Sequence, residues 1–80
     1  MNYTIAKFEQ VQGNLIIVFS KSGNEYVVEI WDKEEHASTI KEFISLHEAY
    51  TVYEKLISWC VFGYYTDNHK KQFLLTGTME

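Results

Sequence analysis

The chain contains no arginine, a single cysteine and no long run of apolar residues. Arginine is the side chain best suited to bidentate contacts with phosphates and guanines, so its absence argues against direct nucleic-acid binding. One cysteine cannot form an internal disulfide, which fits a reducing compartment. The longest apolar run, 15–19, is too short to cross a bilayer. Residues 1–4 also lack the basic-then-apolar layout of a secretion signal. We therefore expect a cytoplasmic protein without a membrane partner.

What is present is a dense supply of apolar side chains in a short chain. Eighty residues suffice for one domain, 1–80, and 46% of them are hydrophobic. Aromatic residues make up 16%, far from the composition of disordered chains. The net charge of −4 makes the protein acidic, with lysine as its only cationic side chain other than histidine. The composition predicts a small folded domain.

Glycine–asparagine pairs divide the first third of the chain. Gly13-Asn14 and Gly23-Asn24 are typical of hairpin turns, because both residue types accept positive φ at low cost. The flanking segments are rich in Val, Ile, Phe and Tyr, which predicts antiparallel strands over 3–10, 14–20 and 25–31. In the third strand the alternation places two sets of side chains on opposite faces: Tyr26, Val28 and Ile30 on one, and Glu25, Val27, Glu29 and Trp31 on the other.

A capping box marks the start of the main helix. Ser45 and Glu48 have the Ser-x-x-Glu spacing, so the helix is expected to begin at Leu46 and to end at Gly63, a residue suited to the left-handed C′ position. The residues on its apolar stripe are Leu46, Ala49, Tyr50, Tyr53, Leu56, Ile57 and Cys60.

The segments around this helix are less distinct. Residues 32–38 are expected to form a loop or a frayed turn, and 39–44 fit a fourth strand or a helix equally well. After a polar turn at 66–71, residues 72–76 have the composition of a last strand. The predicted fold is therefore α+β: an antiparallel three- to four-stranded β-meander packed on one long α-helix, with a short C-terminal strand.

Catalytic or metal-binding patterns are hard to find. His47-Glu48 begins like the His-Glu-x-x-His zinc signature, but Thr51 stands where the second histidine is required. Cys60 falls on the core side of the helix, where a thiol is buried and inert. We expect no catalytic residues, no metal and no cofactor, and the chain is not predicted to be an enzyme.

Aromatic residues exceed what the core stripe needs. Val52, Trp59 and Phe62 lie on the helix flank, while Val27 and Trp31 lie on the far face of the sheet. Such side chains typically anchor protein interfaces. Either residues 73–75 cover the helix-flank group or a second molecule does. The sequence favours the second molecule, which is a copy of the chain (a homodimer) or a host protein.

Acidic residues cluster in the middle of the chain. They are Glu25, Glu29, Asp32, Glu34, Glu35 and Glu42, opposed within 25–42 only by two lysines. One interpretation is a charged edge that prevents sheet-to-sheet aggregation. The other is an acidic patch that attracts a basic partner.

Two short segments carry a resemblance to a known group of proteins. The residues are Gly23, Asn24, Glu25, Tyr26 and Val27, followed by Phe43, Ile44 and Ser45. Over this tenth of the chain the sequence resembles the small acidic anti-CRISPR proteins of low-GC bacterial prophages, which mimic DNA to block Cas9. The resemblance implies an inhibitor of a defence protein, and a helical conformation at 43–45.

These observations lead to two functional hypotheses. The first is a non-catalytic interaction protein, encoded by a phage or mobile element, that binds and inhibits or modulates a bacterial protein. The alternative is a small homo-oligomeric ligand-binding module of a low-GC bacterium.

Overall fold

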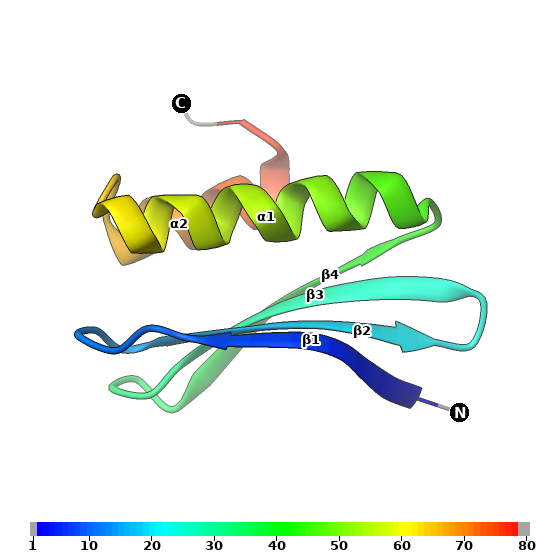
Figure 1. Ribbon diagram of the computed structural model, residues 1–80, viewed down its shortest axis with the longest axis horizontal. Coiled ribbons are helices and arrows are strands. Elements are labelled where there is room, and N and C mark those ends of the chain that lie inside the picture. Colours follow the sequence, from blue (N-terminus) through cyan, green and yellow to red (C-terminus); the bar gives the residue numbers. More distant parts are fainter. Residues whose placement is uncertain (1, 79–80) are drawn as a thin grey trace.

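A computed structural model describes residues 2–78, which form one four-stranded antiparallel sheet with two helices on one of its faces (Figure 1). The strands follow one another in the sheet in chain order, β1-β2-β3-β4, so the sheet is a meander. The α+β class and the antiparallel meander are thus confirmed. The elements are β1 (Asn2–Glu9), β2 (Leu15–Ser22), β3 (Glu25–Asp32), β4 (Ala37–Phe43), α1 (Leu46–Phe62) and α2 (Asp67–Thr76).

Both glycine–asparagine pairs lie in hairpin connections. Gly23 has φ of +62° in the two-residue turn between β2 and β3, a conformation that costs glycine little. Gly13 serves a different purpose, because the Gln10 side chain lies where its Cβ would be. The β3–β4 connection, 33–36, is shorter than the loop expected at 32–38, because β4 begins at Ala37. β4 also includes most of the segment 39–44, which is therefore a strand and not a helix.

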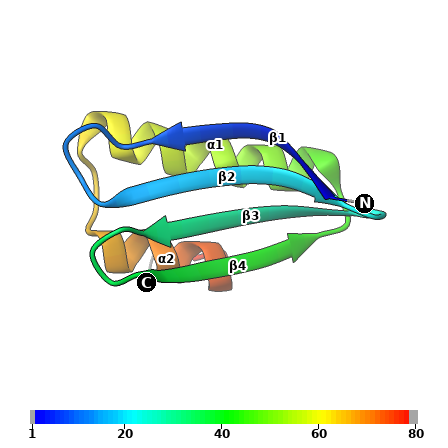
Figure 2. The ribbon, with the colours of Figure 1, turned by 90° about the horizontal axis from the view of Figure 1, so that it is seen from below.

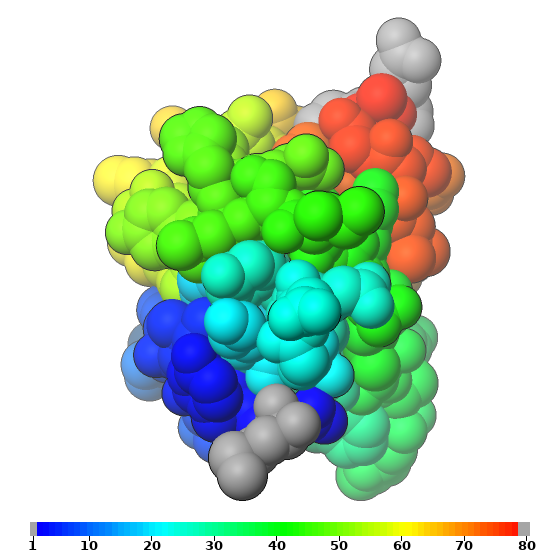
Figure 3. Space-filling model, turned by 90° about the vertical axis from the view of Figure 1, so that its right-hand side faces the viewer, coloured from blue at the N-terminus to red at the C-terminus, as the bar shows by residue number. Residues whose placement is uncertain are grey.

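The sheet has a covered inner face and an open outer face. Figure 2 looks onto the outer face, with both helices behind the sheet, and Figure 3 shows the layers from the β2–β3 hairpin end. The side chains of the core come from both layers: Leu15, Ile17, Phe19, Val28, Ile30 and Phe43 from the sheet, Ala49, Tyr53, Leu56 and Cys60 from α1, and Phe73 and Leu74 from α2. Each large side chain buried this fully contributes about 1.5–3 kcal/mol to folding.

Helix α1 begins and ends where the caps predict. The Ser45 hydroxyl accepts a hydrogen bond from the Glu48 N–H at 3.3 Å, and Gly63 ends the helix with φ of +74°. Phe43 still belongs to β4, so the helix that the anti-CRISPR resemblance implies at 43–45 is not present. Leu46 and Tyr50, expected on the core stripe, are half exposed.

The C-terminal segment is a helix, and the predicted short strand at 72–76 is wrong. Thr66 caps α2 by accepting a hydrogen bond from the His69 N–H at 3.1 Å, and Gly77 closes it with φ of +77°. The expected polar turn at 66–71 is largely the first half of this helix. α2 packs against β4 and beside α1, so two helices of 17 and 10 residues replace the predicted single one. The composition of residues 72–76 alone favours a strand, whereas the Thr66 cap that precedes them starts a helix.

Candidate interaction surfaces

The helix-flank group predicted from the sequence does not form one exposed surface. Trp59 packs edge-on against Phe73 of α2 and against Tyr65, with both ring centroids at 4.8 Å. Val52 also packs against the core. Phe62 alone remains largely exposed, stacked on Tyr64 at 6.0 Å between centroids. Phe73, from the segment 73–75, therefore contacts Trp59, whereas this segment leaves Phe62 exposed.

The outer face of the sheet carries the other predicted interface residues. Val27 and Trp31 lie there, in register with Ser20 and Ile16 of β2. Neither helix covers this side (Figure 2). We call the partly exposed apolar side chains on this side the open sheet face: Ile16, Val18, Val27, Trp31 and Ile40. A solvated sheet face is usually polar, so a strip of this kind is a candidate binding surface.

Acidic side chains lie along the β3 and β4 part of the open sheet face. Glu25 and Glu29 alternate with Val27 and Trp31 along β3, and Glu42 lies opposite Val27 on β4. Glu29 accepts a 2.6 Å hydrogen bond from the Ser38 hydroxyl, which orients its carboxylate on this face. Three of the six predicted acidic residues thus share a surface with two of the predicted apolar anchors. The combination suits a partner that presents cationic groups around an apolar centre.

The remaining acidic residues lie at the β3–β4 turn and make contacts within the chain. Asp32 is buried, and its Oδ1 accepts hydrogen bonds from the N–H groups of Glu34 and Glu35 at 2.9 and 3.1 Å. Its Oδ2 accepts from Lys71 Nζ at 2.8 Å, and Glu35 accepts from the same ammonium at 2.7 Å. Hydrogen bonds from Lys71 and then from the Glu35 amide lower the pKa of Asp32. This group therefore stabilises the turn and attaches α2 to the sheet, whereas Glu25, Glu29 and Glu42 are the part that faces outward.

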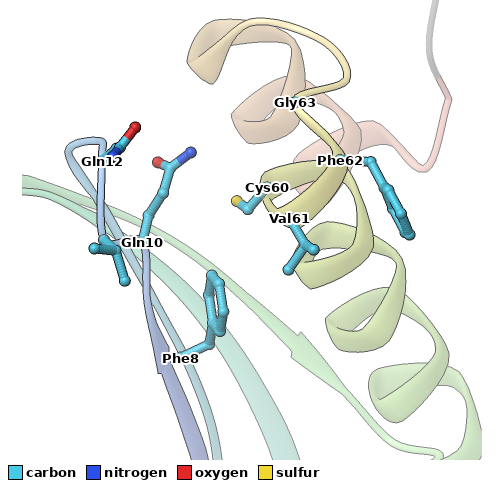
Figure 4. Close-up of a pocket in the computed structure, with 8 residues that line it drawn as sticks. Phe8, Gln10, Gln12, Cys60, Val61, Phe62 and Gly63 are labelled. Atoms are coloured by element: carbon cyan, nitrogen blue, oxygen red, sulfur yellow. The ribbon is translucent and has the colours of Figure 1, made fainter.

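A second surface, not predicted from the sequence, is a groove between α1 and β1. Three cavities of about 510, 450 and 380 Å³ follow one another along it. Neighbouring cavities adjoin each other, since the first two share Val61 and Phe62 and the last two share Ala6 and Tyr50. In Figure 4 the Cys60 and Val61 side chains of α1 are turned toward the end of β1. We refer to this feature as the α1–β1 groove.

The groove exists because β1 bears large side chains that α1 does not fully cover. Among the lining residues, Ile5 on β1 is 43% exposed and Val61 on α1 is 61% exposed. A β-bulge contributes: Thr4 pairs with Ser20 and Ala6 with Phe19, so Ile5 is an extra residue in β1. Ile5 lines a cavity together with Ala6 and Leu46, which places it on the helix side of the sheet. The sequence signal was the apolar pair Ile5-Ala6, which interrupts the alternation of the strand.

The residues considered for chemistry are dispersed. His47 is exposed in the first turn of α1, and within residues 2–78 no three His, Cys, Asp or Glu side chains lie close enough to hold a metal ion. Cys60 is buried, and burial raises the pKa of its thiol, opposed in part by the nearby Lys70 ammonium. Lys70 is itself buried, with Nζ 3.8 Å from Asp67 Oδ1. A thiol with a raised pKa is a poor nucleophile at neutral pH.

Comparison with protein-family models, curated proteins and solved structures gives no match for this chain. In the part that the structure describes, neither helix is long and apolar enough to span a membrane.

Proposed function

We propose that this chain is a non-catalytic interaction protein that binds a bacterial protein through the open sheet face and inhibits or modulates it. The observation that supports this proposal is the position of Trp31 and Val27 on the uncovered side of the sheet, beside Ile16 and Val18. Tryptophan is among the side chains that contribute most to binding energy in protein interfaces. The fold itself does not need these residues on that face, because its core lies on the other side.

The charge around the strip supports a basic partner. Glu25, Glu29 and Glu42 lie on this face, and Glu9 lies opposite Ile16 at its β1 end, where Lys33 pairs with it at 3.2 Å. Complementary charge of this kind speeds association and excludes acidic surfaces. Nucleic-acid-binding proteins are one class that presents a basic surface of this kind. The local resemblance to anti-CRISPR proteins supports a phage or mobile-element origin and an anti-defence role.

The test compares two matched surface variants as baits in bacterial lysate. Trp31→Ala combined with Val27→Ser removes the apolar centre of the open sheet face, whereas Ile44→Ser removes an 87% exposed side chain at the β4–α1 junction. A partner retained by wild type and Ile44→Ser, but lost from the double variant with unchanged circular dichroism, supports the proposal. Equal retention by all three proteins contradicts it.

Charge reversal then tests the chemistry of the partner. Glu29→Lys with Glu42→Lys changes two carboxylates on the open sheet face without altering the Asp32 network. We expect slower association and a weaker dependence of the association rate on salt, since screening acts on the long-range attraction. Binding that ignores both the reversal and the salt concentration would show that these acids only protect the sheet from aggregation.

A further inference from the structure

β1 lies at one edge of the sheet. β1 is the first strand of the sheet order, and within residues 2–78 no strand pairs with its outer edge. An open edge offers unpaired N–H and C=O groups to another strand, and many proteins protect it with inward charges or proline. β1 has neither on its helix side, where Tyr3, Ile5 and Phe8 lie. Lys7 on the opposite side and the bulge at Ile5 also limit pairing, so the edge can pair only in a register that accommodates both.

The bulge gives β1 a symmetric pattern of faces. Register with β2 places Ala6 and Phe8 opposite the buried Phe19 and Ile17, on the helix side. The strand therefore places Tyr3, Ile5, Ala6 and Phe8 on the helix side of the sheet. It places Asn2, Thr4, Lys7 and Glu9 on the outer face of the sheet, away from the helices, which we call the outer side of the strand. The pattern of outer-side and helix-side residues is the same whether the strand is followed from Asn2 to Glu9 or from Glu9 to Asn2. The reason is that the extra residue Ile5 puts two consecutive helix-side residues, Ile5 and Ala6, at the centre of the strand.

This symmetry selects one antiparallel register with an identical strand. Residues that face each other across an antiparallel pair must point to the same side of the sheet. For β1 against a second β1, this holds when Tyr3 faces Phe8 and Thr4 faces Lys7. Shifting the register by one residue places helix-side residues against outer-side ones. In a strand of the same length without the bulge, the first and last residues would point to opposite sides of the sheet, and the pattern would not be symmetric about the centre of the strand.

We propose that two copies of the chain pair through their β1 edges, about a two-fold axis between Ile5 and Ala6. The result is a continuous eight-stranded sheet with both α1 helices on the same side. The two-fold axis repeats the Tyr3–Phe8 contact, and aromatic cross-strand pairs stabilise sheets. On the outer side Lys7 faces Thr4 and Glu9 faces Asn2, so no like charges stand opposite each other.

The α1–β1 groove explains why the occupant is a second copy of the chain. Pairing along β1 brings the partner's α1 to the open side of the groove, where Tyr50, Val61 and Phe62 are exposed. An extended segment of another protein would supply a strand but no helix to cover this side. A second copy supplies both, and each copy closes the groove of the other. Such reciprocal coverage is the property of a two-fold interface.

The first experiment measures mass in solution by light scattering and sedimentation over a range of concentrations. Wild type is expected at twice the 9.4 kDa chain mass. Ile5→Lys places a charge beside the two-fold axis and should return the protein to the chain mass, whereas Ile44→Lys, at an exposed site away from β1, should stay dimeric. Tyr3→Lys replaces Ile5→Lys if circular dichroism shows that the latter is unfolded. Wild type at the chain mass throughout overturns the proposal.

The second experiment tests the register with disulfides in a Cys60→Ser background. Facing residues of an antiparallel pair have Cα atoms about 4.5–5.5 Å apart, within the range that a disulfide requires. Thr4→Cys with Lys7→Cys should therefore give a covalent dimer under mild oxidation, and each single variant should not. If the Ile5→Lys variant remains dimeric, another surface forms the dimer. If the single cysteine variants cross-link as fully as the double variant, another register is used. Because this interface is separate from the open sheet face, its failure leaves the proposed partner binding intact, and the reverse also holds.

Discussion

Lys71 on α2 donates a hydrogen bond to Asp32 at the end of β3, with Nζ 2.8 Å from Oδ2. The two residues are 39 positions apart in the chain, and the contact joins the helix layer to the sheet. Both side chains are largely shielded from solvent, at 15% and 6% exposure. Shielded ion pairs depend on both partners, because removing one leaves the other without compensation.

Replacing the lysine should therefore destabilise the fold. Lys71→Met leaves the shielded Asp32 carboxylate with its two backbone donors only, and we expect a loss of about 1–3 kcal/mol in the free energy of unfolding. Urea denaturation measures it. Gln72→Met, at an exposed position of the same helix, is the control and should change stability by less than about 0.5 kcal/mol. Equal midpoints for the two variants would show that the contact contributes nothing.

The same pair predicts a dependence of stability on pH. The pKa of Asp32 is held below its ordinary value near 3.8, chiefly by the Lys71 hydrogen bond. The contribution of the ionised Asp32 carboxylate to the free energy of unfolding is therefore fully present above pH 3.8, and it is lost as the pH falls through the lowered pKa. The difference in stability between wild type and Lys71→Met should shrink as the pH is lowered from 7 toward 2. A constant difference over this range would contradict the assignment.

At high pH the lysine gives the complementary effect. The pKa of Lys71 is raised above 10.5 by its hydrogen bonds to Asp32 and Glu35. The contribution of the protonated Lys71 ammonium to the free energy of unfolding is therefore fully present below pH 10.5, and it is lost as the pH rises through the raised pKa. The stability of wild type should thus fall toward that of Lys71→Met above this pH. Thermal melts in buffers on both sides of the transition check the direction.

Trp59 provides a test of the helix layer. Because its ring packs on Phe73 and Tyr65, Trp59→Ala should remove a contact between α1 and α2 and cost about 3 kcal/mol. Ile44→Ser, at an exposed position, should change the unfolding free energy by less than about 0.5 kcal/mol. Calorimetry distinguishes the two. An unaffected Trp59→Ala variant would mean that α2 is not held by this cluster.

The start of α1 provides another. The Ser45 hydroxyl caps the helix at the Glu48 amide, so Ser45→Ala should cost about 1 kcal/mol. Ser58→Ala removes a hydroxyl from the interior of the same helix, where alanine is the better helix former, and should not destabilise it through the cap. Chemical denaturation of both variants measures the difference. Equal losses would show that the cap has no specific role.

Cys60 predicts slow thiol chemistry. The side chain is buried, and burial raises the pKa of the thiol. A disulfide reagent at pH 8 should therefore label the folded protein much more slowly than the same protein in concentrated urea. Equal rates would indicate a solvent-exposed thiolate.

The sequence predicted the meander and α1 because their signals are local. Glycine at Gly23, alternation in β3 and the Ser45–Glu48 box each act within a few residues. The sequence does not predict α2, because Lys70 lies on its buried face beside Phe73 and Leu74 and breaks the apolar periodicity that marks a helix. The environment of Trp59 depends on α2, because a fold with α1 alone on the sheet would leave this ring on a free surface. The α1–β1 groove depends on a bulge and on the separation of two layers, neither of which local periodicity encodes.

The meander order of the sheet also has a consequence for how quickly the chain reaches its native state. Every strand pairs with its neighbour in the chain, and two of the three connections are hairpins that contain a glycine. Contacts between segments close in sequence require little loop closure, so the entropic barrier to their formation is low. The hairpins are free to form during synthesis, before α1 and α2 are available to cover them. With no proline in the chain, slow prolyl isomerisation cannot limit refolding, and a single rapid phase is the expected kinetic behaviour of the monomer.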